Sequence, residues 1–333
     1  MSGAVLTEIE AYGKQKEAFL RTFLELPNGI PSHDTFNRVF KFLDKKAFGD
    51  CLYRWSKEIL TDLRVNLPHL CLDGKVQRAT AKRGKKKSGL CMVSAWVSEH
   101  NLVLGQERVD AKSNEKTAIP QLLGSLDLKG SLVSIDAIAC QLSNADLIVG
   151  KQGHYLLALK KNNKGIHEQV SQRMQAKKAS LPQAEHVDFG SGRIERRRCY
   201  VENDLALYDD LAGWEHLGSI VMVEASREIG DKTSNETRYY LSDLALAPDV
   251  FNGLVRAHWG IENSLHWMLD VVFLEDRQRV RSGNAPDNMA TLRKLAMQML
   301  DHMKDKQSTK NRRKMAGWND EYLAQILDKI KCV

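Results

Sequence analysis

Apolar residues in the first part of the chain recur at helical spacing. One stripe follows the turn signal Pro31-Ser32, has the spacing i, i+3, i+4, i+7 and consists of Phe36, Val39, Phe40 and Leu43. A second stripe follows Asp44 and consists of Phe48, Leu52, Trp55 and Ile59. This spacing predicts amphipathic helices, the first with Ser32 or Asp34 as its N-cap. Residues 1–67 are therefore predicted to form a small N-terminal helical module.

From residue 68 the pattern changes to short runs of β-forming residues. The predicted strands cover residues 70–72, 91–97, 102–109, 131–135 and 155–159, and helical patterns at 113–125 and 139–149 separate the last three. Pro120 would kink the first of these helices or mark the first turn of a shorter one. Three strands, a helix, a strand, a helix and a strand match an α/β fold with a ribonuclease-H-like mixed sheet and flanking helices. In such a sheet the first and fourth strands are parallel neighbours.

Shorter β-like pieces follow at residues 194–201, 219–224 and 238–241. They predict a β-rich insertion at about 185–245, part of which could complete the main sheet. A long helical pattern begins at Pro248, with one apolar face made of Leu254, Ile261, Leu265, Met268 and Val272. Helical patterns return at 285–303 and 318–330. Residues 68–333 are thus expected to form one catalytic domain that contains the insertion.

Composition narrows the class of protein. The chain has 333 residues, 43% of them hydrophobic and 27% charged, which excludes a disordered tail, a collagen-like fibre and a disulfide-stapled miniprotein. No apolar run approaches the roughly 18 residues of a membrane span, and the first residues lack the apolar region of a signal peptide. The six cysteines are far apart and form no C-x-x-C pair. We therefore expect a cytoplasmic protein with reduced thiols and no membrane partner.

Basic residues exceed acidic ones, 49 to 42, and many lie in clusters at residues 82–87, 193–198 and 304–314. Such clusters suit a polyanion, above all nucleic acid, although a solvated surface loop explains any one of them equally well. The first cluster consists of Lys82, Arg83, Lys85, Lys86 and Lys87. It is expected to contact the DNA backbone, and Lys160 and Lys161, which follow a strand, are candidates for the same role.

Two carboxylates come at the ends of predicted neighbouring strands. Functional groups of open α/β sheets sit at the carboxyl ends of parallel strands, and Asp73 and Asp136 would occupy adjacent ends. Glu262, on the helix after Pro248, could reach back to them. Three converging carboxylates require divalent cations, and hard oxygen ligands favour Mg²⁺, with Mn²⁺ as a substitute. Two such ions about 3.5–4 Å apart would hold a phosphodiester for in-line attack.

Each of these residues also has an ordinary structural explanation. Asp73-Gly74 is a common turn pair, Asp136 could cap the following helix, and Glu262 could face solvent. His258 and His266, four residues to either side of Glu262, would project from the same side of a helix. They could contact the scissile phosphate, orient Glu262, pack in the core or, with Glu262, bind Zn²⁺, although the H-E-x-x-H pattern is absent. Trp259 and Trp267 could stack on an unpaired base, but core packing is the favoured explanation for both.

Several longer blocks of sequence resemble a known family. They are LPNGIPSHDTFNRVF (26–40), LDGK (72–75), KSNEKTAIPQLLGSLDLKG (112–130), SIDAIACQ (134–141), YLLALKKNN (155–163), RAHWGIENSLHWMLDVVFLEDRQRVR (256–281) and AGWNDEYLAQIL (316–327). With them the chain resembles insertion-sequence transposases of the DDE type, in the group that includes the H-repeat-associated proteins. The resemblance implies metal-dependent DNA cleavage at element ends and strand transfer into a target. It places the metal ligands at Asp73, Asp136 and Glu262.

The chain departs from the wider superfamily in two ways. The pattern Tyr-x₂-Arg-x₃-Glu-x₆-Lys around the catalytic Glu has Val255, His258 and Leu269 at its three other places, so the groups that grip the phosphates are not implied. The helical segment before residue 27 is also short for the family, which suggests a truncated copy. A catalytically inactive DNA-binding remnant, or a nuclease that cuts without joining, therefore stays open. The expected partners are double-stranded DNA and, because two ends must be paired, a second protomer on that DNA in the bacterial nucleoid, with no small-molecule cofactor.

Overall fold

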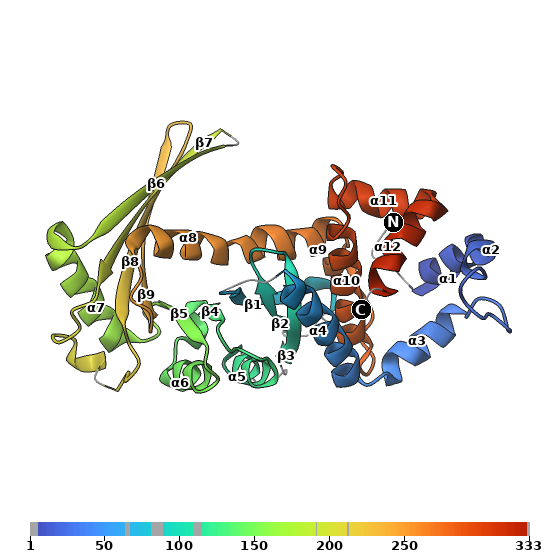
Figure 1. Ribbon diagram of the computed structural model, residues 1–333, viewed down its shortest axis with the longest axis horizontal. Coiled ribbons are helices and arrows are strands. Elements are labelled where there is room, and N and C mark those ends of the chain that lie inside the picture. The colour runs from blue at the N-terminus through green and yellow to red at the C-terminus, as the bar shows by residue number, and fades with distance from the viewer. Residues whose placement is uncertain are drawn as a thin grey trace.

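The computed structural model describes residues 6–63, 67–80, 89–109, 115–190, 192–211 and 213–331. Within these ranges one mixed nine-stranded sheet runs through the molecule, in the order β3-β2-β1-β4-β5-β9-β8-β7-β6 (Figure 1). The strands are β1 (His69–Gln77), β2 (Leu90–Val97), β3 (Leu102–Val109), β4 (Leu132–Ile135), β5 (His154–Leu159), β6 (Gln183–Gly190), β7 (Arg193–Glu202), β8 (Ser219–Ile229) and β9 (Lys232–Ser242).

The first five strands have the topology that the sequence predicts. β1 pairs antiparallel with β2, and β2 with β3, while β1, β4 and β5 are successive parallel neighbours. Antiparallel neighbours need only a tight turn, whereas parallel ones need a crossover. Helices α5 (Glu115–Ser125) and α6 (Leu142–Gly150) form the two crossovers. The ribonuclease-H-like α/β prediction is therefore confirmed, and Pro120 lies inside α5 rather than in its first turn.

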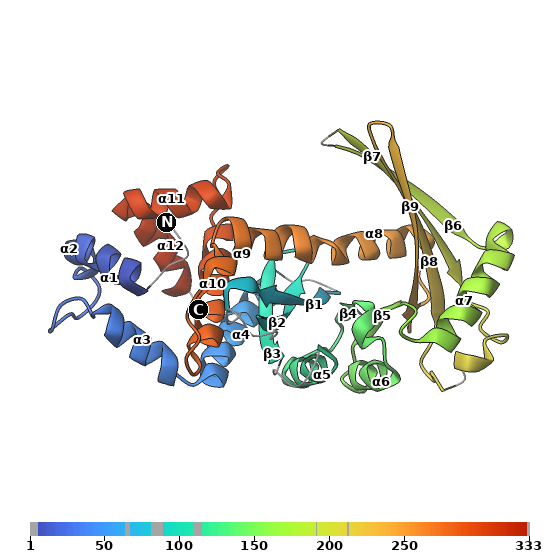
Figure 2. The same ribbon diagram turned by 180° about the vertical axis from the view of Figure 1, so that it is seen from behind.

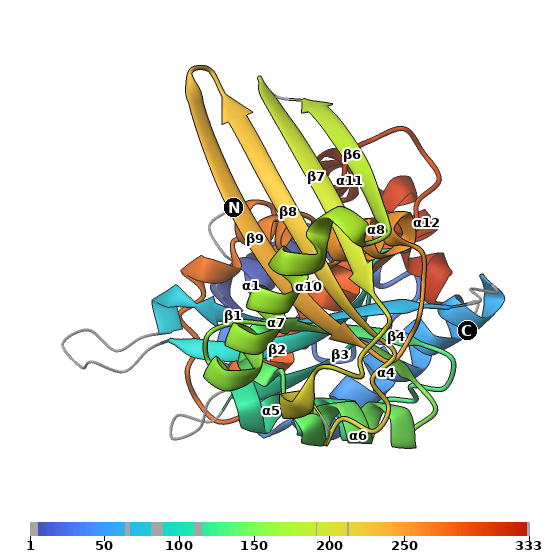
Figure 3. The same ribbon diagram turned by 90° about the vertical axis from the view of Figure 1, so that its left-hand side faces the viewer.

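The β-rich region extends the main sheet. β9 pairs antiparallel with β5, and β8, β7 and β6 follow in an antiparallel series. The ends of these strands project as a long twisted ribbon beyond the helices (Figures 1 and 3). The sequence predicted three of the four strands. It missed β6, whose side chains are almost all exposed and so show no alternation of apolar and polar residues.

Helices cover both faces of the sheet. α5, α6 and α7 (Lys164–Lys177) lie on one face, and the long helical run from α8 (Pro248–His258) to α9 (Trp267–Val271) crosses the other (Figures 1 and 2). The remaining helices gather at the β3 end of the molecule. They are α1 (Leu6–Gln15), α2 (Glu17–Leu20), α3 (His33–Phe42), α4 (Lys45–Asp62), α10 (Ala285–Asp301), α11 (Thr309–Trp318) and α12 (Asp320–Lys331).

The N-terminal helices begin where their capping residues predict. The Ser32 hydroxyl accepts a hydrogen bond from the Thr35 N–H, and the Asp44 carboxylate accepts one from the Ala47 N–H at 2.8 Å. Leu52 and Trp55 of α4 are buried. The apolar stripe of α3 is not: Val39 is 51% exposed, because α3 lies beside α1 and α10 rather than across a sheet. Helical spacing therefore predicted α3 correctly but not the burial of its apolar side.

Three apolar clusters fill the space between these layers. The largest joins the sheet to α5, α6 and α7 and includes Leu72 and Ile135. A second joins α4, β2, the helical run at 261–273, α10 and α12, and it includes Trp55 and Trp96. A third packs Phe251 and Val255 of α8 against β4, β5 and the later strands. The run from α8 to α9 thus spans the second and third clusters and is held against the sheet along its length.

Candidate active site

Asp73 and Asp136 occupy neighbouring positions on two parallel strands. β1 and β4 pair with Leu72 opposite Ile135, and each aspartate is the next residue along. β4 ends at Ile135, whereas β1 continues to Gln77. The register therefore brings the two carboxylates to the carboxyl edge of β4, as the strand order predicts.

Side-chain alternation decides which face of the sheet Asp73 uses. Successive residues of a strand point to opposite faces. Leu72 belongs to the cluster under α5, whereas Cys71 packs in the cluster on the helical run at 261–273. Asp73, two residues after Cys71, faces the same helical run. Its side chain is 21% exposed, and its Oδ2 lies 3.4 Å from Nδ1 of His266.

Lys160 neutralises the second aspartate. Its Nζ lies 2.9 Å from Oδ1 and 3.2 Å from Oδ2 of Asp136. Burial alone would raise the pKa of Asp136, but the Lys160 ammonium and the Ala137 N–H outweigh it and hold that pKa below its usual value. From its sequence position Lys160 was only a candidate for contacting the DNA backbone. Lys160 follows β5, the next parallel strand after β4, and this position was a signal that it would meet Asp136.

A buried chain of polar groups lies behind the two aspartates. The Ser134 Oγ is 2.7 Å from Nε2 of His69 and 2.7 Å from Nδ1 of His258, so its hydroxyl can donate to one ring and accept from the other. Burial lowers the pKa of His69 to about 3. It lowers that of His258 to about 4, although Asp136 acts in the opposite direction. Both rings are therefore neutral at pH 7, and the placement of His258 is that of a hydrogen-bonded core histidine.

A π-helical segment carries Glu262. Residues Ile261–His266 form i→i+5 hydrogen bonds, an arrangement that often marks functional sites. It begins after Gly260, where a Cβ atom would lie 3.1 Å from Cη2 of the buried Trp96 ring. Such a contact is tighter than most Cβ contacts, so glycine favours this close approach of the helix to the sheet. Glu262 itself is exposed on this segment.

The two histidines that flank Glu262 both lie against the sheet. α-Helical spacing predicts that His258, Glu262 and His266 share one side, but Glu262 is exposed while both histidines contact strand residues of the same sheet face. His258 is bonded to Ser134, whereas His266 is beside Asp73. Burial lowers the pKa of His266 to about 4, so an uncharged ring lies against Asp73 at pH 7. His266 is thus placed to orient Asp73 rather than Glu262.

The fit of these residues to a metal can be tested from their chemistry and placement. Among the described residues, no three His, Cys, Asp or Glu side chains are close enough together to hold an ion. The zinc alternative at His258, Glu262 and His266 therefore has no support. Asp73, Asp136 and Glu262 offer only hard oxygen donors, which is the set that Mg²⁺ and Mn²⁺ prefer. For the three carboxylates to bind one ion, Asp136 would have to give up its ion pair with Lys160, and the exposed Glu262 side chain would have to turn towards the two aspartates.

A buried ionic cluster lies one turn beyond the candidate site, and sequence reasoning missed it. The Nζ of Lys75 is 2.6 Å from Oδ1 of Asp270 and 3.0 Å from Oε2 of Glu275. Glu275 is only 2% exposed, and Lys294 of α10 is also buried. Burial would raise the pKa of Glu275, but Lys294 and Lys75 outweigh it and lower that pKa. The signal available was the occurrence of Lys75, Asp270 and Glu275 directly beside the apolar residues of the blocks 72–75 and 256–281.

The residues that were expected to contact DNA differ in their exposure in the structure. Lys82, Arg83, Lys85, Lys86 and Lys87 lie outside the described residues. Lys161 is exposed. Trp259 is half-buried, with the Arg238 guanidinium 4.1 Å from its ring centroid. Trp267 is 53% exposed, so core packing, the favoured explanation for this residue, is wrong.

Comparison with known proteins agrees with this geometry. The family described as Transposase DDE domain matches residues 61–299, and the domain described as associated with it matches residues 1–56. "Putative transposase YncI" of Escherichia coli O157:H7 is 36% identical over 96% of this chain and 84% of its own length. "H repeat-associated putative transposase YhhI" of Escherichia coli K12 is 31% identical over 96% of this chain and 86% of its own length. No helix in the described ranges is long and apolar enough to cross a membrane. The chain belongs to the DDE transposase family.

Proposed function

We propose that this protein cuts DNA at the ends of an insertion sequence and joins the freed ends to a target, with Asp73, Asp136 and Glu262 as its metal ligands. The observation that carries the proposal is the parallel register of β1 and β4, which makes Asp73 and Asp136 neighbours. Membership of the DDE transposase family supports the same assignment. The exposed position of Glu262 leaves its side chain free to approach DNA and the two aspartates together.

The three carboxylates would hold Mg²⁺ or Mn²⁺, two ions in all, which would activate the attacking hydroxyl and stabilise the leaving oxygen. The remaining steps belong to the chain's own residues. His266 holds Asp73 from the helical side. Lys160 releases Asp136 when the site is loaded, and its ammonium is then available to a DNA phosphate. The exposed ring of Trp267, next to His266, can stack on an unpaired base.

The test uses a supercoiled plasmid that carries the DNA flanking this gene. The plasmid is incubated with the protein and Mn²⁺, and breaks and joints are mapped by sequencing. Asp136→Asn should abolish both products, and EDTA should do the same to the wild-type protein. Asp127→Asn is the matched control, because Asp127 is also a half-exposed carboxylate paired with a lysine, at 2.8 Å from Lys57, but lies outside the site. It should cut and join like the wild type.

A second candidate function is a DNA-binding remnant that has lost catalysis. It is favoured by the pairing of Asp136 with Lys160 and by the lack of a closed three-carboxylate cluster among the described residues. Binding of the flanking DNA without any break, in Mg²⁺ or Mn²⁺, would establish the remnant and refute the transposase. Breaks without joints would instead identify a nuclease.

The proposal includes a dimer on DNA, because both ends of an element must be paired before transfer. Gel filtration of the protein with a duplex carrying one element end should give a complex with two protomers and two duplexes. A complex with one protomer on paired ends would refute this part of the proposal.

A further inference from the structure

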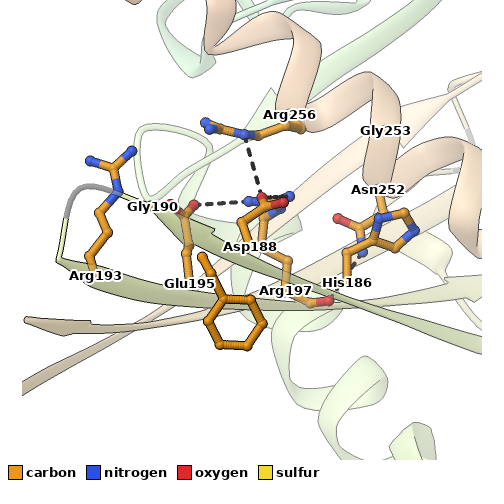
Figure 4. A pocket seen from close by; sticks show the side chains of 10 residues that line it. His186, Asp188, Gly190, Arg193, Glu195, Arg197, Asn252, Gly253 and Arg256 are labelled. Atoms are coloured by element: carbon orange, nitrogen blue, oxygen red, sulfur yellow. Dashed lines mark hydrogen bonds and ion pairs between the residues drawn. The ribbon is translucent and has the colours of Figure 1, made fainter.

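A cleft of about 470 Å³ lies between the β6–β7 ribbon and α8, away from the carboxylates (Figure 4). The ribbon contributes Asp188, Arg193, Glu195 and Arg197, and the helix contributes Arg256, with a neighbouring asparagine. Three guanidinium groups face two carboxylates here. The lining therefore carries a net positive charge.

Arg197 is the fixed part of this cleft. It is 6% exposed, and its guanidinium is held by Asp188 at 2.7 Å and by Glu195 at 3.0 Å. The Asn252 side chain donates a hydrogen bond to the Arg197 carbonyl at 3.1 Å, which ties α8 to β7. Two carboxylates of the ribbon thus neutralise the buried arginine, and the Asn252 hydrogen bond holds the ribbon to the helix.

The other two arginines of the cleft, Arg193 and Arg256, have no close carboxylate partner among the described residues. Arg256 approaches Asp188 only to 4.0 Å and is 41% exposed. Within the described ranges, no hydrogen bond or ion pair engages the Arg193 side chain. Figure 4 shows both guanidinium groups on the same open side of the cleft. Asp188 and Glu195 bind Arg197 at closer range, so the Arg193 and Arg256 guanidinium groups are available to an anion from outside the chain.

We infer that Arg193 and Arg256 bind a backbone phosphate of the DNA that flanks the bond to be cut. Guanidinium groups match phosphate oxygens in pairs, and an open cleft between a ribbon and a helix admits a polymer. Arg256 lies six residues before Glu262 on the same helical run, about 9 Å along its axis at ~1.5 Å per residue. DNA has one phosphate per strand every ~3.4 Å of axis, so the contacted phosphate lies a few nucleotides from the cut. The inference rests on the proposed function, because Glu262 defines where the cut is.

The experiment measures the affinity of the full-length protein for a fluorescein-labelled duplex carrying the flanking DNA, as a function of salt. Three variants are compared with the wild type: Arg193→Ala/Arg256→Ala, its lysine counterpart Arg193→Lys/Arg256→Lys, and Arg196→Ala. Arg196 is the matched control, because it is exposed on the same strand but on the opposite side from Arg197. Melting temperatures identify any variant that does not fold.

The double alanine variant should reduce the slope of log K against log salt by about 1 per guanidinium removed. The lysine variant and Arg196→Ala should have slopes that differ from the wild-type slope by less than about 0.5. Uncharged methylphosphonates placed one at a time along the duplex should weaken binding by the wild type at one or two positions within a few nucleotides of the cut. They should have no effect at those positions on the double alanine variant.

An equal slope for the double alanine variant and Arg196→Ala would overturn the inference, as would a methylphosphonate effect that is the same in both proteins. If the wild type binds the duplex but makes no break, the proposed function fails while the comparison of slopes still decides whether the cleft binds phosphate. If the wild type does not bind the duplex at all, both are refuted.

Discussion

At the scale of single residues, the proposed site predicts that Lys160, which is bound to Asp136 in the structure, would compete with a metal ion for that carboxylate. Lys160→Ala removes a positive charge about 3 Å from the carboxylate oxygens, so Mn²⁺ should bind more tightly. At this half-exposed position the gain should be about 1 kcal/mol, or roughly fivefold in affinity. Electron paramagnetic resonance of free Mn²⁺ measures it directly. Lys161→Ala, which removes an exposed neighbour, should leave the affinity unchanged, and an equal gain in both variants would show that Lys160 acts only through net charge.

A second residue-scale prediction concerns Glu275. Glu275→Gln leaves Lys294 and Lys75 without their shared partner in the interior, which should cost about 3–5 kcal/mol of unfolding free energy at pH 7. Because the folded-state pKa of Glu275 is lowered, its contribution is complete above the unfolded pKa, near 4.5, and is lost as pH falls through the folded value. The difference between wild type and variant should therefore shrink below pH 4.5.

Urea denaturation at pH 7 and at pH 4 measures this difference. Asp127→Asn, which breaks the exposed Lys57 pair, should cost less than about 1 kcal/mol at pH 7. Equal costs for the two variants would mean that burial does not strengthen the Glu275 cluster.

Part of the candidate site could be predicted from the sequence. The neighbouring aspartates were predictable, because strand order and the ends of apolar runs are local signals. The partners of those aspartates were not. Lys160 and His266 owe their positions to the register of β5 and to the phase of the π segment. A one-residue shift of the β5 register or of the π segment would turn the Lys160 or the His266 side chain away from its aspartate. No residue pattern in the sequence predicts that register or that phase.

At the scale of elements, the helical run that carries Glu262 depends on Gly260. Gly260→Ala brings a Cβ within 3.1 Å of the Trp96 ring, which is buried and cannot move away freely. The change should lower the unfolding free energy by about 1–3 kcal/mol and displace Glu262, so cleavage should fall more than stability alone explains. Thermal unfolding and cleavage of the flanking-DNA plasmid measure the two effects.

Gly49→Ala in α4 is the control for this change. A Cβ at Gly49 meets nothing within 4 Å, so alanine should stabilise the helix by up to about 1 kcal/mol and leave cleavage unchanged. If Gly260→Ala behaved in the same way, close approach to Trp96 would not be what positions the π segment.

Elements with a regular apolar pattern were the ones that sequence predicted. β7, β8 and β9 end in short runs of buried, mostly apolar residues where they join the main sheet, and α4 and α10 have buried apolar faces. The sequence did not predict α7 and α11, because both helices are mostly polar and each has only two buried residues. Pairing of β9 with β5 joins residues at least 80 positions apart, so the sequence could predict it only as one alternative.

At the scale of the whole molecule, the predicted boundary between residues 1–67 and 68–333 stays a prediction, and the packing of α4 provides a test of it. Trp55 is 7% exposed and shares a cluster with Trp96 of β2 and Met297 of α10. Trp55→Ala should cost about 3–5 kcal/mol. Phe42→Ala, at a residue 70% exposed, should change stability by less than about 0.5 kcal/mol.

Chemical denaturation followed by far-ultraviolet circular dichroism distinguishes the outcomes. A single transition that shifts as a whole in Trp55→Ala would mean that the helical module and the sheet unfold together. A separate early transition, affected alone, would establish the module as an independent domain.

The edge strand β6 has a consequence for how copies of this protein behave in concentrated solution. An edge strand of eight residues that is paired on one side only offers its outer backbone N–H and C=O groups to any other open edge, which is how sheets grow into aggregates. Here the strand carries Glu185 and Asp188 along its length. Charged side chains along an edge strand disfavour its pairing with another strand. The same carboxylates that bind Arg197 and Arg198 within one molecule thus help to keep this open edge from being extended by the next.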